Sequence, residues 1–493
     1  MKPSPAFLAF DLGAESGRAI LGRLRNDRIE LQEIHRFSNG PVCVGDSLYW
    51  DVLRLWGEMK HGLALAAREA GDELVSLGVD TWGVDFGLLD KEDNLIGNPF
   101  HYRDRRTDGM LEKVSQTISP VEIYRQTGIQ NIAINSLYQL VSMEKSAQLA
   151  SARRFLNLPD LFNFWFSGVK ASEHTIASTT QCYNPPAGTW AWDLLEKLGL
   201  PTNIFGAIVP PGSVLGKIRP SLAIEIGMGD LNVVAVASHD TQSAIAAIPA
   251  DSEKYIYVSS GTWSLVGIEV EQPIINAASR TCALTNEGGY GGKFCLLKNI
   301  VGLWLLQECR REWARKGMEY SYDELTRLAA SAPPLKFFIN PSDPVFLAPG
   351  DMAVRIREYC RVTGQPVPEE HAEIIRCILE SLSLEYRHVI EQISNLSGFS
   401  LPVIHIIGGG ARNELLDQFT ANATGKKVIA GPVEATALGN ILVQSIAAGH
   451  VTSLADGRAL IRRSVETREY DPVDTALWDQ AYERYVKLRK TDG

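Results

Sequence analysis

Residues 7–24, FLAFDLGAESGRAILGRL, decide the fold of this chain. The turn at residues 13–17 contains glycine at both ends and has an apolar run on each side. Apolar runs around such a turn predict an antiparallel hairpin, and the Asn26-Asp27 pair extends it into a meander. The expected strands are residues 7–11, 18–24 and 29–37.

The stretch that follows the meander predicts a helix and a fourth strand. Asp51 is a suitable N-cap, apolar residues recur every three or four positions from Val52 to Ala70, and Gly71 is a typical helix stop. Residues 74–79 then form another apolar run. The predicted order is therefore β-β-β-α-β.

The same layout restarts in the second half of the chain. Residues 257–269, YVSSGTWSLVGIE, again consist of a strand, a Gly-containing turn and a strand. This indicates an α/β protein in which one lobe is a structural duplicate of the other. The elements expected there are strands 254–259, 263–269, 293–297 and 403–407, helices 301–315 and 372–396, and a helix between Asn413 and Gly425.

The duplication sets the expected domains. The pattern is interrupted around residues 245–253, so we expect an N-terminal domain at 1–248 and a C-terminal domain at 249–493. Residues 100–230 do not fit the repeat and are expected to be an insertion that shapes a substrate pocket. The last helix is expected to pack back on the N-terminal domain.

Composition excludes several classes of function. The net charge of −10 argues against broad nucleic-acid or anionic-membrane surfaces, which need clustered Lys and Arg. No apolar run reaches the roughly 18 residues of a membrane span, and no signal peptide is recognised. The seven cysteines include no CxxC pair. We therefore expect a cytoplasmic protein with free thiols; Cys360 and Cys377 could approach each other, but free thiols are favoured.

Two turns are candidates for phosphate binding. Turns of this kind, facing one another, present backbone N–H groups to nucleotide phosphates. The first, residues 11–18, adds Asp11 at a strand end, and this carboxylate could hold Mg²⁺ through water. The second is Ser259 to Thr262. Each turn viewed alone is better explained as an ordinary hairpin turn.

Gly408-Gly409-Gly410 follows an apolar strand and opens a helix. Glycines there allow close approach to the backbone, and a helix N-terminus favours anions. The sequence matches neither the Rossmann fingerprint, since Asn413 replaces its third glycine, nor a P-loop, since no Gly-Lys pair is followed by Ser or Thr. An adenosine contact and a plain strand-to-helix turn both remain open.

Ser238-His239-Asp240-Thr241 is the sharpest candidate for chemistry. It follows the apolar strand 232–236 and precedes an Ala-rich helical stretch. A carboxylate at such a strand end faces a cleft and is kept ionised by the helix dipole, which suits the base of a phosphoryl transfer. The alternative is that Asp240 is only a helix N-cap.

Residues 80–87, DTWGVDFG, are a second polar cluster after a strand. Asp85 next to Trp82 and Phe86 combines a carboxylate for hydroxyl pairs with aromatic faces for sugar C–H edges. A buried strand end with core aromatics explains the cluster equally well. For Arg105 and Arg106 nearby, a solvated salt-bridge loop is favoured.

These motifs resemble those of the FGGY-type carbohydrate kinases over essentially the whole chain. The resemblance is carried by FDLGAESGR (10–18), GVDTWGVDFGLLD (78–90), HYRDRRT (101–107), SHDTQSA (238–244), YVSSGTWSL (257–265) and IIGGGARN (406–413). It implies two ribonuclease-H-like domains of the actin/hexokinase ATPase type with a cleft between them. It also implies Asp240 as the proton acceptor.

Further residues take roles through the same resemblance. Besides Asp85, the positions matched to sugar contacts are Gly83, His239, Asp240, Thr241 and Asn299. The positions matched to ATP contacts are Ala14, Glu15, Ser16, Gly17, Arg18, Thr262, Gln307 and Gly409, with Asp11 facing the metal. Glu15 departs from the usual Ser or Thr, and a carboxylate near phosphates repels them unless it points away or binds metal.

The implied reaction is phosphorylation of L-rhamnulose by ATP with Mg²⁺, in the degradation of L-rhamnose. Another ketose such as L-fuculose stays open, because residue spacing does not report hydroxyl stereochemistry. The alternatives from other classes are an actin-like ATPase, for which no peptide-binding module remains in the chain, and a silent sugar sensor, against which the SHDT motif argues. The expected partners are the ketose and ATP, with no nucleic acid and no membrane; the oligomeric state stays open.

Overall fold

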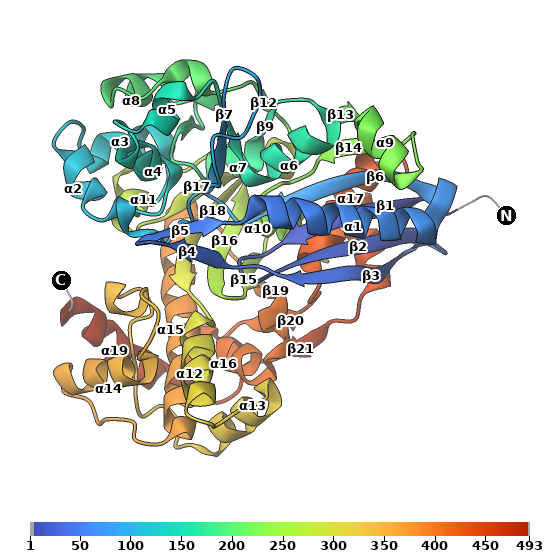
Figure 1. Ribbon diagram of the computed structural model, residues 1–493. Helices are drawn as coiled ribbons and strands as arrows, with labels where there is room; N and C mark the ends of the chain where they lie inside the picture. Colours follow the sequence, from blue (N-terminus) through green and yellow to red (C-terminus); the bar gives the residue numbers. More distant parts are fainter. Residues whose placement is uncertain (1–3, 492–493) are drawn as a thin grey trace. The chain divides into compact units, whose positions relative to one another are not determined.

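The computed structural model describes residues 4–491, and the chain divides into two compact units (Figure 1). The first unit comprises Met1–Asp251, Glu269–Leu296 and Ala435–Val465, and the second comprises Ser252–Ile268, Leu297–Glu434 and Glu466–Gly493. Both units are therefore discontinuous in sequence. The boundary at residues 248–249 stays a prediction.

The first unit is built on a six-stranded sheet with the order β13-β14-β6-β1-β2-β3. Its strands are β1 (Ala6–Leu12), β2 (Ser16–Arg25), β3 (Arg28–Ser38), β6 (Leu74–Thr81), β13 (Ser213–Lys217) and β14 (Asn232–Ala235). The meander β1-β2-β3 is antiparallel, whereas β1, β6 and β14 run parallel. This confirms the hairpin predicted at residues 7–24 and the fourth strand.

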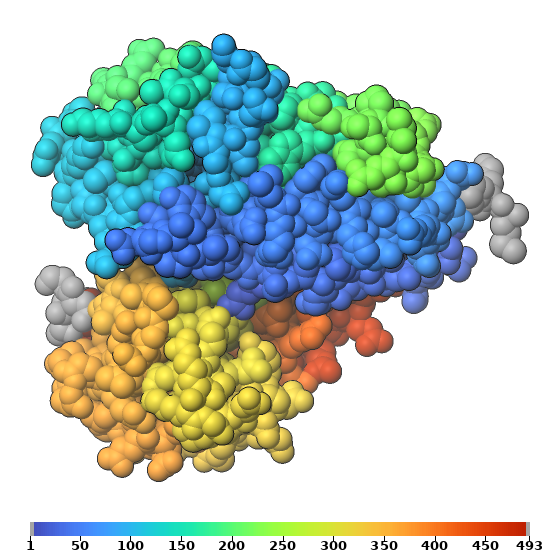
Figure 2. Space-filling model, in the orientation of Figure 1, coloured from blue at the N-terminus to red at the C-terminus, as the bar shows by residue number. Residues whose placement is uncertain are grey.

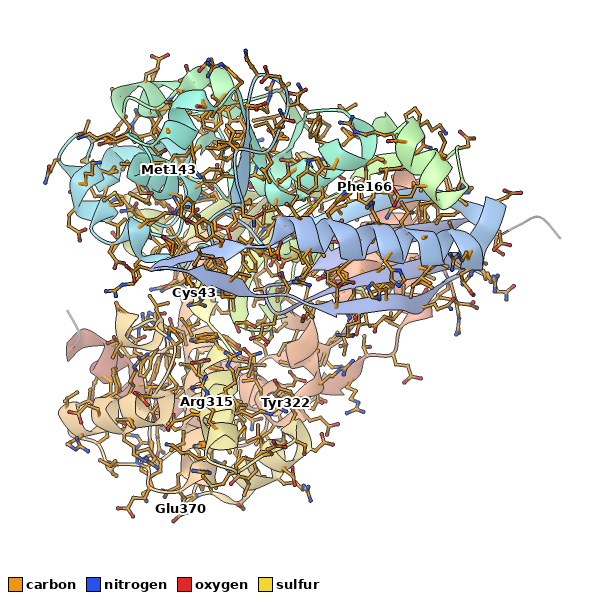
Figure 3. All side chains as sticks on the ribbon, viewed as in Figure 1. Cys43, Met143, Phe166, Arg315, Tyr322 and Glu370 are labelled. Carbon is orange, nitrogen blue, oxygen red and sulfur yellow. The ribbon has the colours of Figure 1, made fainter. Side chains whose placement is uncertain are left out.

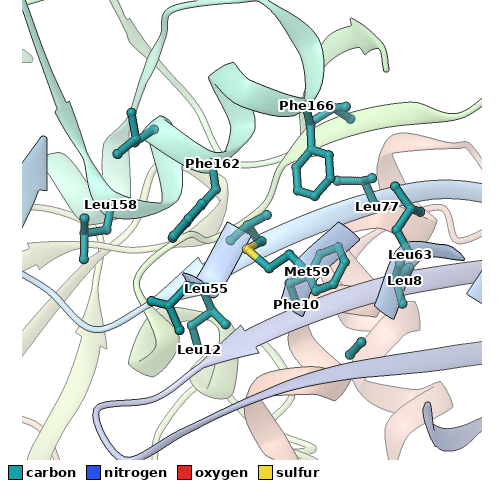
Figure 4. Close-up of a cluster of buried hydrophobic side chains, with 14 of the residues drawn as sticks. Leu8, Phe10, Leu12, Leu55, Met59, Leu63, Leu77, Leu158, Phe162 and Phe166 are labelled. Atoms are coloured by element: carbon teal, nitrogen blue, oxygen red, sulfur yellow. The ribbon is translucent and has the colours of Figure 1, made fainter. Parts of the chain in front are cut away.

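The central strand β1 is buried on both faces, so its alternating side chains enter two different cores. Leu8, Phe10 and Leu12 pack against α1 (Val52–Ala70) and α6 (Leu158–Ser167) (Figure 4). On the other face, Phe7 and Ala9 pack with residues of α17 (Ala435–Ala447). The sheet is thus covered by helices on both faces, as parallel strands require.

Helix α1 begins and ends where its sequence predicts. The Asp51 side chain accepts a hydrogen bond from the Arg54 backbone N–H at 3.1 Å, and Gly71 at the C-cap has a φ of 52°. Such a positive φ strains residues with a Cβ, which is why glycine ends the helix. Arg54, His61 and Arg68 on α1 are exposed, and Figure 2 shows the segment of the chain that contains α1 at the surface.

A short hairpin between the meander and α1 was not predicted. It consists of β4 (Pro41–Val44) and β5 (Ser47–Trp50), joined through Gly45. All four residues of β4 are exposed, including Cys43, which Figure 3 labels. Because neither face of β4 enters a core, the sequence lacks the alternation by which strands are recognised.

Residues 100–230 form a largely helical region of the first unit. Its elements are α2 (Met110–Ser115), α3 (Pro120–Thr127), α4 (Ser136–Ser142), α5 (Ala147–Ser151), β8 (Arg154–Asn157), α6, β9 (Ser172–Glu173), α7 (His174–Ser178), β10 (Tyr183–Asn184), β11 (Thr189–Trp190), α8 (Trp192–Lys197), β12 (Ile208–Val209), β13 and α9 (Pro220–Ile226). Strand β8 pairs with β7 (Phe86–Leu89). The region has its own apolar cluster around Phe155, but α6 and β13 belong to the main sheet and its cover.

The second unit repeats the strand pattern of the first. Its strands are β15 (Ile256–Ser260), β16 (Trp263–Val270), β18 (Phe294–Val301), β19 (Val403–Ile407), β20 (Lys427–Ala430) and β21 (Arg468–Tyr470). The end of β16, at residues 269–270, and the start of β18, at residues 294–296, belong to the first unit. As with β1, β2 and β6, strand β15 forms an antiparallel hairpin with β16 and pairs in parallel with β19. This supports the structural duplication inferred from the two Gly-containing turns.

The helices of the second unit include the three predicted there and also two, at residues 322–331 and 352–362, that were not predicted. They are α12 (Trp304–Arg315), α13 (Tyr322–Ser331), α14 (Met352–Val362), α15 (His371–Ser397), α16 (Glu414–Thr424) and α19 (Thr475–Thr491). The helix predicted to start at Val301 starts at Trp304, because β18 continues to Val301. The chain returns to the first unit through α17 and α18 (Leu454–Ser464), whereas its last helix, α19, belongs to the second.

One carboxyl group in the second unit is buried without a partner. Asp417, on α16, is 0% exposed, and neither of its side-chain oxygens makes a hydrogen bond. Burial therefore raises the pKa of Asp417 well above its usual range. Because this pKa is higher in the folded than in the unfolded chain, Asp417 opposes folding at neutral pH, and the penalty fades as the pH falls towards about 4.

We expect Asp417→Asn to stabilise the protein, by at least about 2 °C in Tm at pH 8 and by less at pH 5. The amide keeps the shape of the carboxyl group but cannot ionise. Thermal unfolding at both pH values measures the effect, with Glu414→Gln, an exposed position on the same helix, as control. An equal Tm shift at the two pH values would contradict the explanation.

Candidate active site

Two polar segments meet at the ends of neighbouring parallel strands. Strand β6 ends at Thr81, whose backbone N–H donates to the carbonyl of Ser238 at 2.9 Å, and Thr81 is bridged to His239. The carboxyl ends of parallel strands therefore bring residues 80–85 and 238–241 to one edge of the sheet. The two clusters singled out in the sequence form one site in the first unit.

Asp240 opens helix α10 (Asp240–Ala246) at this edge. Its Oδ1 accepts hydrogen bonds from the Thr241 backbone N–H at 2.6 Å and from Thr241 Oγ1 at 3.3 Å. Burial raises the pKa of Asp240 to about 6, with the nearby His239 acting in the opposite direction. This pKa leaves Asp240 ionised at neutral pH and close to the optimum of a base. The contribution of the helix dipole stays a prediction.

Two further carboxylates, those of Asp11 and Asp80, lie near Asp240 and interact with it electrostatically. Asp80 is 0% exposed; its Oδ2 accepts from Asn440 Nδ2 at 2.6 Å, and its Oδ1 has no partner. Burial, together with the charge of Asp11, raises the pKa of Asp80 well above its usual range. Asp11 forms an ion pair with Arg18, the residue opposite it on β2.

A strained turn follows β6. Val84 has a φ of 68°, which is rare for a β-branched residue and is found where surrounding contacts enforce it. The Val84 N–H donates to Thr179 Oγ1 at 3.1 Å, and its carbonyl accepts from Gln139 Nε2 at 3.3 Å. A Cβ at Gly83 would lie 3.1 to 3.2 Å from atoms of the Thr179 side chain, so glycine there allows the close approach.

Asp85 lies beneath this turn and is 1% exposed. Its Oδ2 accepts from the indole N–H groups of Trp50 at 2.6 Å and Trp82 at 2.9 Å, and its Oδ1 accepts from Gln139 Nε2 at 3.0 Å. Burial raises its pKa to about 6. These contacts favour a role in holding the aromatic side chains over a direct contact with a sugar; the predicted contact stays untested.

The two arginines of the neighbouring loop behave differently. The Arg105 side chain is 88% exposed, as predicted for a solvated loop. The prediction is wrong for Arg106, whose side chain is only 14% exposed and donates to the Gln139 carbonyl at 2.9 Å and to Ser142 Oγ at 3.0 Å. A side chain that reaches α4 across a loop leaves no local signal in the sequence.

Residues that were not predicted from the sequence bind the backbone of the segment 238–241. The Ser238 N–H donates to Glu173 Oε2 at 3.1 Å, and the His239 N–H donates to Thr175 Oγ1 at 3.1 Å. Burial raises the pKa of Glu173 to about 7. Glu287, on β17 (Thr285–Gly288), lies against the His239 ring.

The first predicted phosphate turn is a tight β1-β2 connection. The Gly13 N–H donates to the Ser16 carbonyl at 2.9 Å, and the Gly13 carbonyl accepts from Asn39 Nδ2 at 2.8 Å. Gly17 is required by packing, since a Cβ there would meet the Phe37 ring at 2.2 Å. Glu15 is exposed at the tip, next to half-buried Ala14.

The second predicted phosphate turn lies in the second unit, where it packs on the glycine loop. A Cβ at Gly410 would lie 2.0 Å from Ser260 Oγ, and Gly408 has a φ of 82°. A Cβ at Gly409, by contrast, would meet nothing within 4 Å. The loop is thus closed on the Ser260 side and open at Gly409, as a cradle for a flat group requires.

Helix α12 starts directly beneath this turn. The Thr262 carbonyl accepts from Gly302 and Trp304, each at 3.1 Å, which ties the turn to the helix. Gln307, in the first turns of α12, has a buried Oε1 without a hydrogen-bond partner. The unpartnered Oε1 of Gln307 suits a ligand contact. Asn299 lies partly exposed on β18, the strand that leads to the helix.

The predicted site residues therefore fall into two groups. The first unit holds Asp11, Ala14 to Arg18, Gly83, Asp85 and His239 to Thr241, and the second holds Thr262, Asn299, Gln307 and Gly409. Within residues 4–491, no three His, Cys, Asp or Glu side chains gather in a metal-binding arrangement. The same described part of the chain contains no helix that is long and apolar enough to cross a membrane.

Comparisons with known proteins identify relatives over nearly the whole chain. Residues 6–247 match the N-terminal domain of the FGGY family of carbohydrate kinases, and residues 256–448 match its C-terminal domain. The rhamnulokinase of Bacteroides thetaiotaomicron is 46% identical over 97% of this chain and 98% of its own length. The rhamnulokinase of Oceanobacillus iheyensis is 40% identical over 94% and 98%.

Solved structures share the fold at much lower identity. A ligand-bound xylulose kinase from Lactobacillus acidophilus has a TM-score of 0.81 at 16% identity, covering 99% of this chain and 98% of its own. Plasmodium falciparum glycerol kinase with ADP has a TM-score of 0.79 at 14% identity, covering 98% of each chain. The predicted two-domain α/β kinase fold is confirmed.

Proposed function

The chain belongs to the FGGY family of carbohydrate kinases, and on this premise we propose that it transfers the γ-phosphoryl group of ATP to O1 of L-rhamnulose, in rhamnose degradation. Relatives described as rhamnulokinases, 37% to 46% identical and matched over at least 94% of this chain, support this substrate. Asp240, an ionisable carboxylate at a strand end beside the Gly83 turn, is the observation that carries the proposal.

In this proposal Asp240 accepts the proton of the sugar hydroxyl. Phosphoryl transfer passes through a loose transition state, so the base orients the hydroxyl and takes its proton late. Thr241, whose N–H and hydroxyl both donate to Oδ1, leaves Oδ2 to face the sugar. Gly83, His239 and Asn299 are proposed to contact the other sugar hydroxyls, and Asp85 to support the site by holding the side chains of Trp50 and Trp82.

ATP is proposed to bind through both Gly-containing turns. Its phosphates would lie along residues 14–18 and Thr262, and its adenosine side against Gln307 and Gly409. The open face at Gly409 and the unpartnered Oε1 of Gln307 support this assignment. The exposed Glu15 side chain can point away from the phosphates, which avoids the repulsion that its charge would cause.

Mg²⁺ is proposed to bind with the nucleotide and to meet the protein at Asp11. The carboxylate of Asp11, on β1, is a hard oxygen donor, and Mg²⁺ binds proteins through one or two such groups while phosphate and water oxygens supply its other ligands. When bound, the ion neutralises phosphate charge. Asp11 would then exchange its ion pair with Arg18 for a water-mediated contact, which frees Arg18 for a phosphate. The ATP requirement favours a cytoplasmic enzyme.

A panel of ketoses in a coupled ADP-release assay tests the function. We expect kcat/KM to be highest for L-rhamnulose and at least about tenfold lower for L-fuculose and D-xylulose, because a site that hydrogen-bonds each hydroxyl rejects misplaced ones. A preference for another ketose would change the substrate within the family. ADP release that does not depend on sugar would favour an actin-like ATPase, and sugar binding without turnover would favour a sensor.

A further inference from the structure

The side chain of His239 lies between two carboxylates of the first unit. Its Nδ1 is 3.0 Å from Glu287 Oε2, and its Nε2 is 3.5 Å from Asp240 Oδ1. Both distances are ion-pair distances, although Nδ1 lacks the geometry of a linear hydrogen bond to any acceptor. Electrostatic attraction depends on distance more than on angle, so the contacts favour a positively charged ring.

Glu287 is fixed in this position by an ordered set of side chains. It is 4% exposed, and its Oε2 also accepts from Gln242 Nε2 at 3.1 Å. The thiol of Cys295 donates to Gln242 Oε1 at 3.1 Å, which orients the amide so that its NH₂ group faces Glu287. The contacts of Glu287 to His239 and Gln242 are both made by Oε2, so this oxygen is committed to protein partners.

Other charged groups do not duplicate this contact. Glu173 also faces the His239 side chain, but its oxygens accept from the N–H groups of Ser238, Thr175 and Ile176. Asp11 and Asp80 face Asp240 and oppose its ionisation, with Arg18 paired to Asp11. Among these groups, Glu287 is the carboxylate that lies at ion-pair distance from the ring nitrogen remote from Asp240.

We propose that Glu287 is a positioning residue that keeps His239 charged and directed at Asp240, so that Asp240 stays ionised and ready to accept a proton. Glu287 acts through the ring and does not touch the sugar. Burial by itself lowers the pKa of His239, but Glu287, Asp240 and Glu173 together more than offset this, with Glu287 contributing first among them, so that the pKa is raised. The proposed effect on turnover rests on the kinase function above, whereas the effect on the ring does not.

The direct test is the titration of His239 in the substrate-free protein. The chain has nine histidines, so the His239 signal of ¹³C-histidine-labelled protein is assigned by its absence in His239→Asn. Glu287→Gln keeps the shape of the side chain and removes its charge, and we expect it to lower the pKa of His239 by at least about one unit. An unchanged pKa in a folded variant would overturn the proposal, whether or not the protein phosphorylates a ketose.

The second test is the pH profile of kcat with the preferred ketose. Loss of the positive ring raises the pKa of Asp240, so we expect Glu287→Gln to move the acidic limb of the profile to higher pH. Activity should fall about tenfold at pH 6 and at most about threefold at pH 8. A merely structural role predicts an equal loss at every pH, and this result would also overturn the proposal.

Three further variants complete the design. Glu287→Asp keeps the charge and should restore most of the activity at pH 6. Glu271→Gln, on an exposed surface pair with Lys293, should leave both readouts unchanged. In a His239→Asn background, Glu287→Gln should have no further effect on the pH profile, because its action passes through the ring. A full additional shift in that double variant would contradict the proposed route.

Discussion

Asp240→Asn is expected to lower kcat by about three orders of magnitude while leaving the dissociation constants of ATP and sugar within about threefold. The amide has the size of the carboxyl group and can keep the hydrogen bonds from Thr241 to its oxygen. It cannot accept the proton of the sugar hydroxyl. Steady-state turnover and isothermal titration of each ligand separate the two effects.

The matched control is Asp230→Asn, the same substitution on the loop before β14. The Asp230 side chain is 93% exposed and pairs only at the surface with Lys217. Surface pairs of this kind contribute little, so turnover should stay at the level of the unmodified protein. Near-full activity of Asp240→Asn would remove Asp240 as the base, and a loss of sugar binding of the same size as the loss of kcat would assign it to binding instead.

The strands and turns around the two hairpins could be predicted because their signals are local. In β1, a turn rich in glycine follows a short apolar run, and α1 has its cap, its period and its stop within one stretch. The hairpin β4-β5 could not be predicted, because β4 is exposed on both faces and carries no pattern. The start of α12 was placed too early because apolar residues of β18 run directly into the helix.

The sequence predicted those residues of the candidate site that lie within recognisable motifs. Asp240 and Gly83 stand in two motifs that the parallel strands β6 and β14 bring together, and this follows from the strand order. Contacts from remote segments were missed. Glu173 holds residue 238 and Glu287 approaches residue 239 from strands that are far away in sequence, and neither lies in a recognisable pattern.

For Asp85, the sequence indicates the composition of a sugar site but not the groups to which its carboxylate is hydrogen-bonded. A carboxylate between Trp82 and Phe86 has the composition of a sugar site. In the folded chain the carboxylate accepts hydrogen bonds from Trp50, a residue of the unpredicted hairpin. Hydrogen-bond donors that arrive from outside the motif decide whether a buried acid faces the ligand or the protein, and spacing along the chain does not report them.

The second large effect is expected from Gly439→Ala, which should lower Tm by more than about 5 °C and kcat by at least about tenfold. Gly439 is on α17, where a Cβ would lie 1.7 Å from the carbonyl oxygen of Ser243 on α10. A helix backbone cannot yield as a flexible side chain can, so the two helices must separate. Because α10 begins at Asp240, the separation moves the candidate base.

Gly57→Ala is the matched control, since Gly57 lies in α1 and a Cβ there meets nothing within 4 Å. Alanine is the better helix former by about 0.5–1 kcal/mol, so this variant should raise Tm slightly and leave turnover unchanged. Thermal unfolding and kcat of both variants are measured side by side. Because α17 packs closely on α10, we expect the same substitution to lower Tm at Gly439 and to raise it at Gly57. A Gly439→Ala variant with unchanged Tm and kcat would show that α10 can shift without moving Asp240.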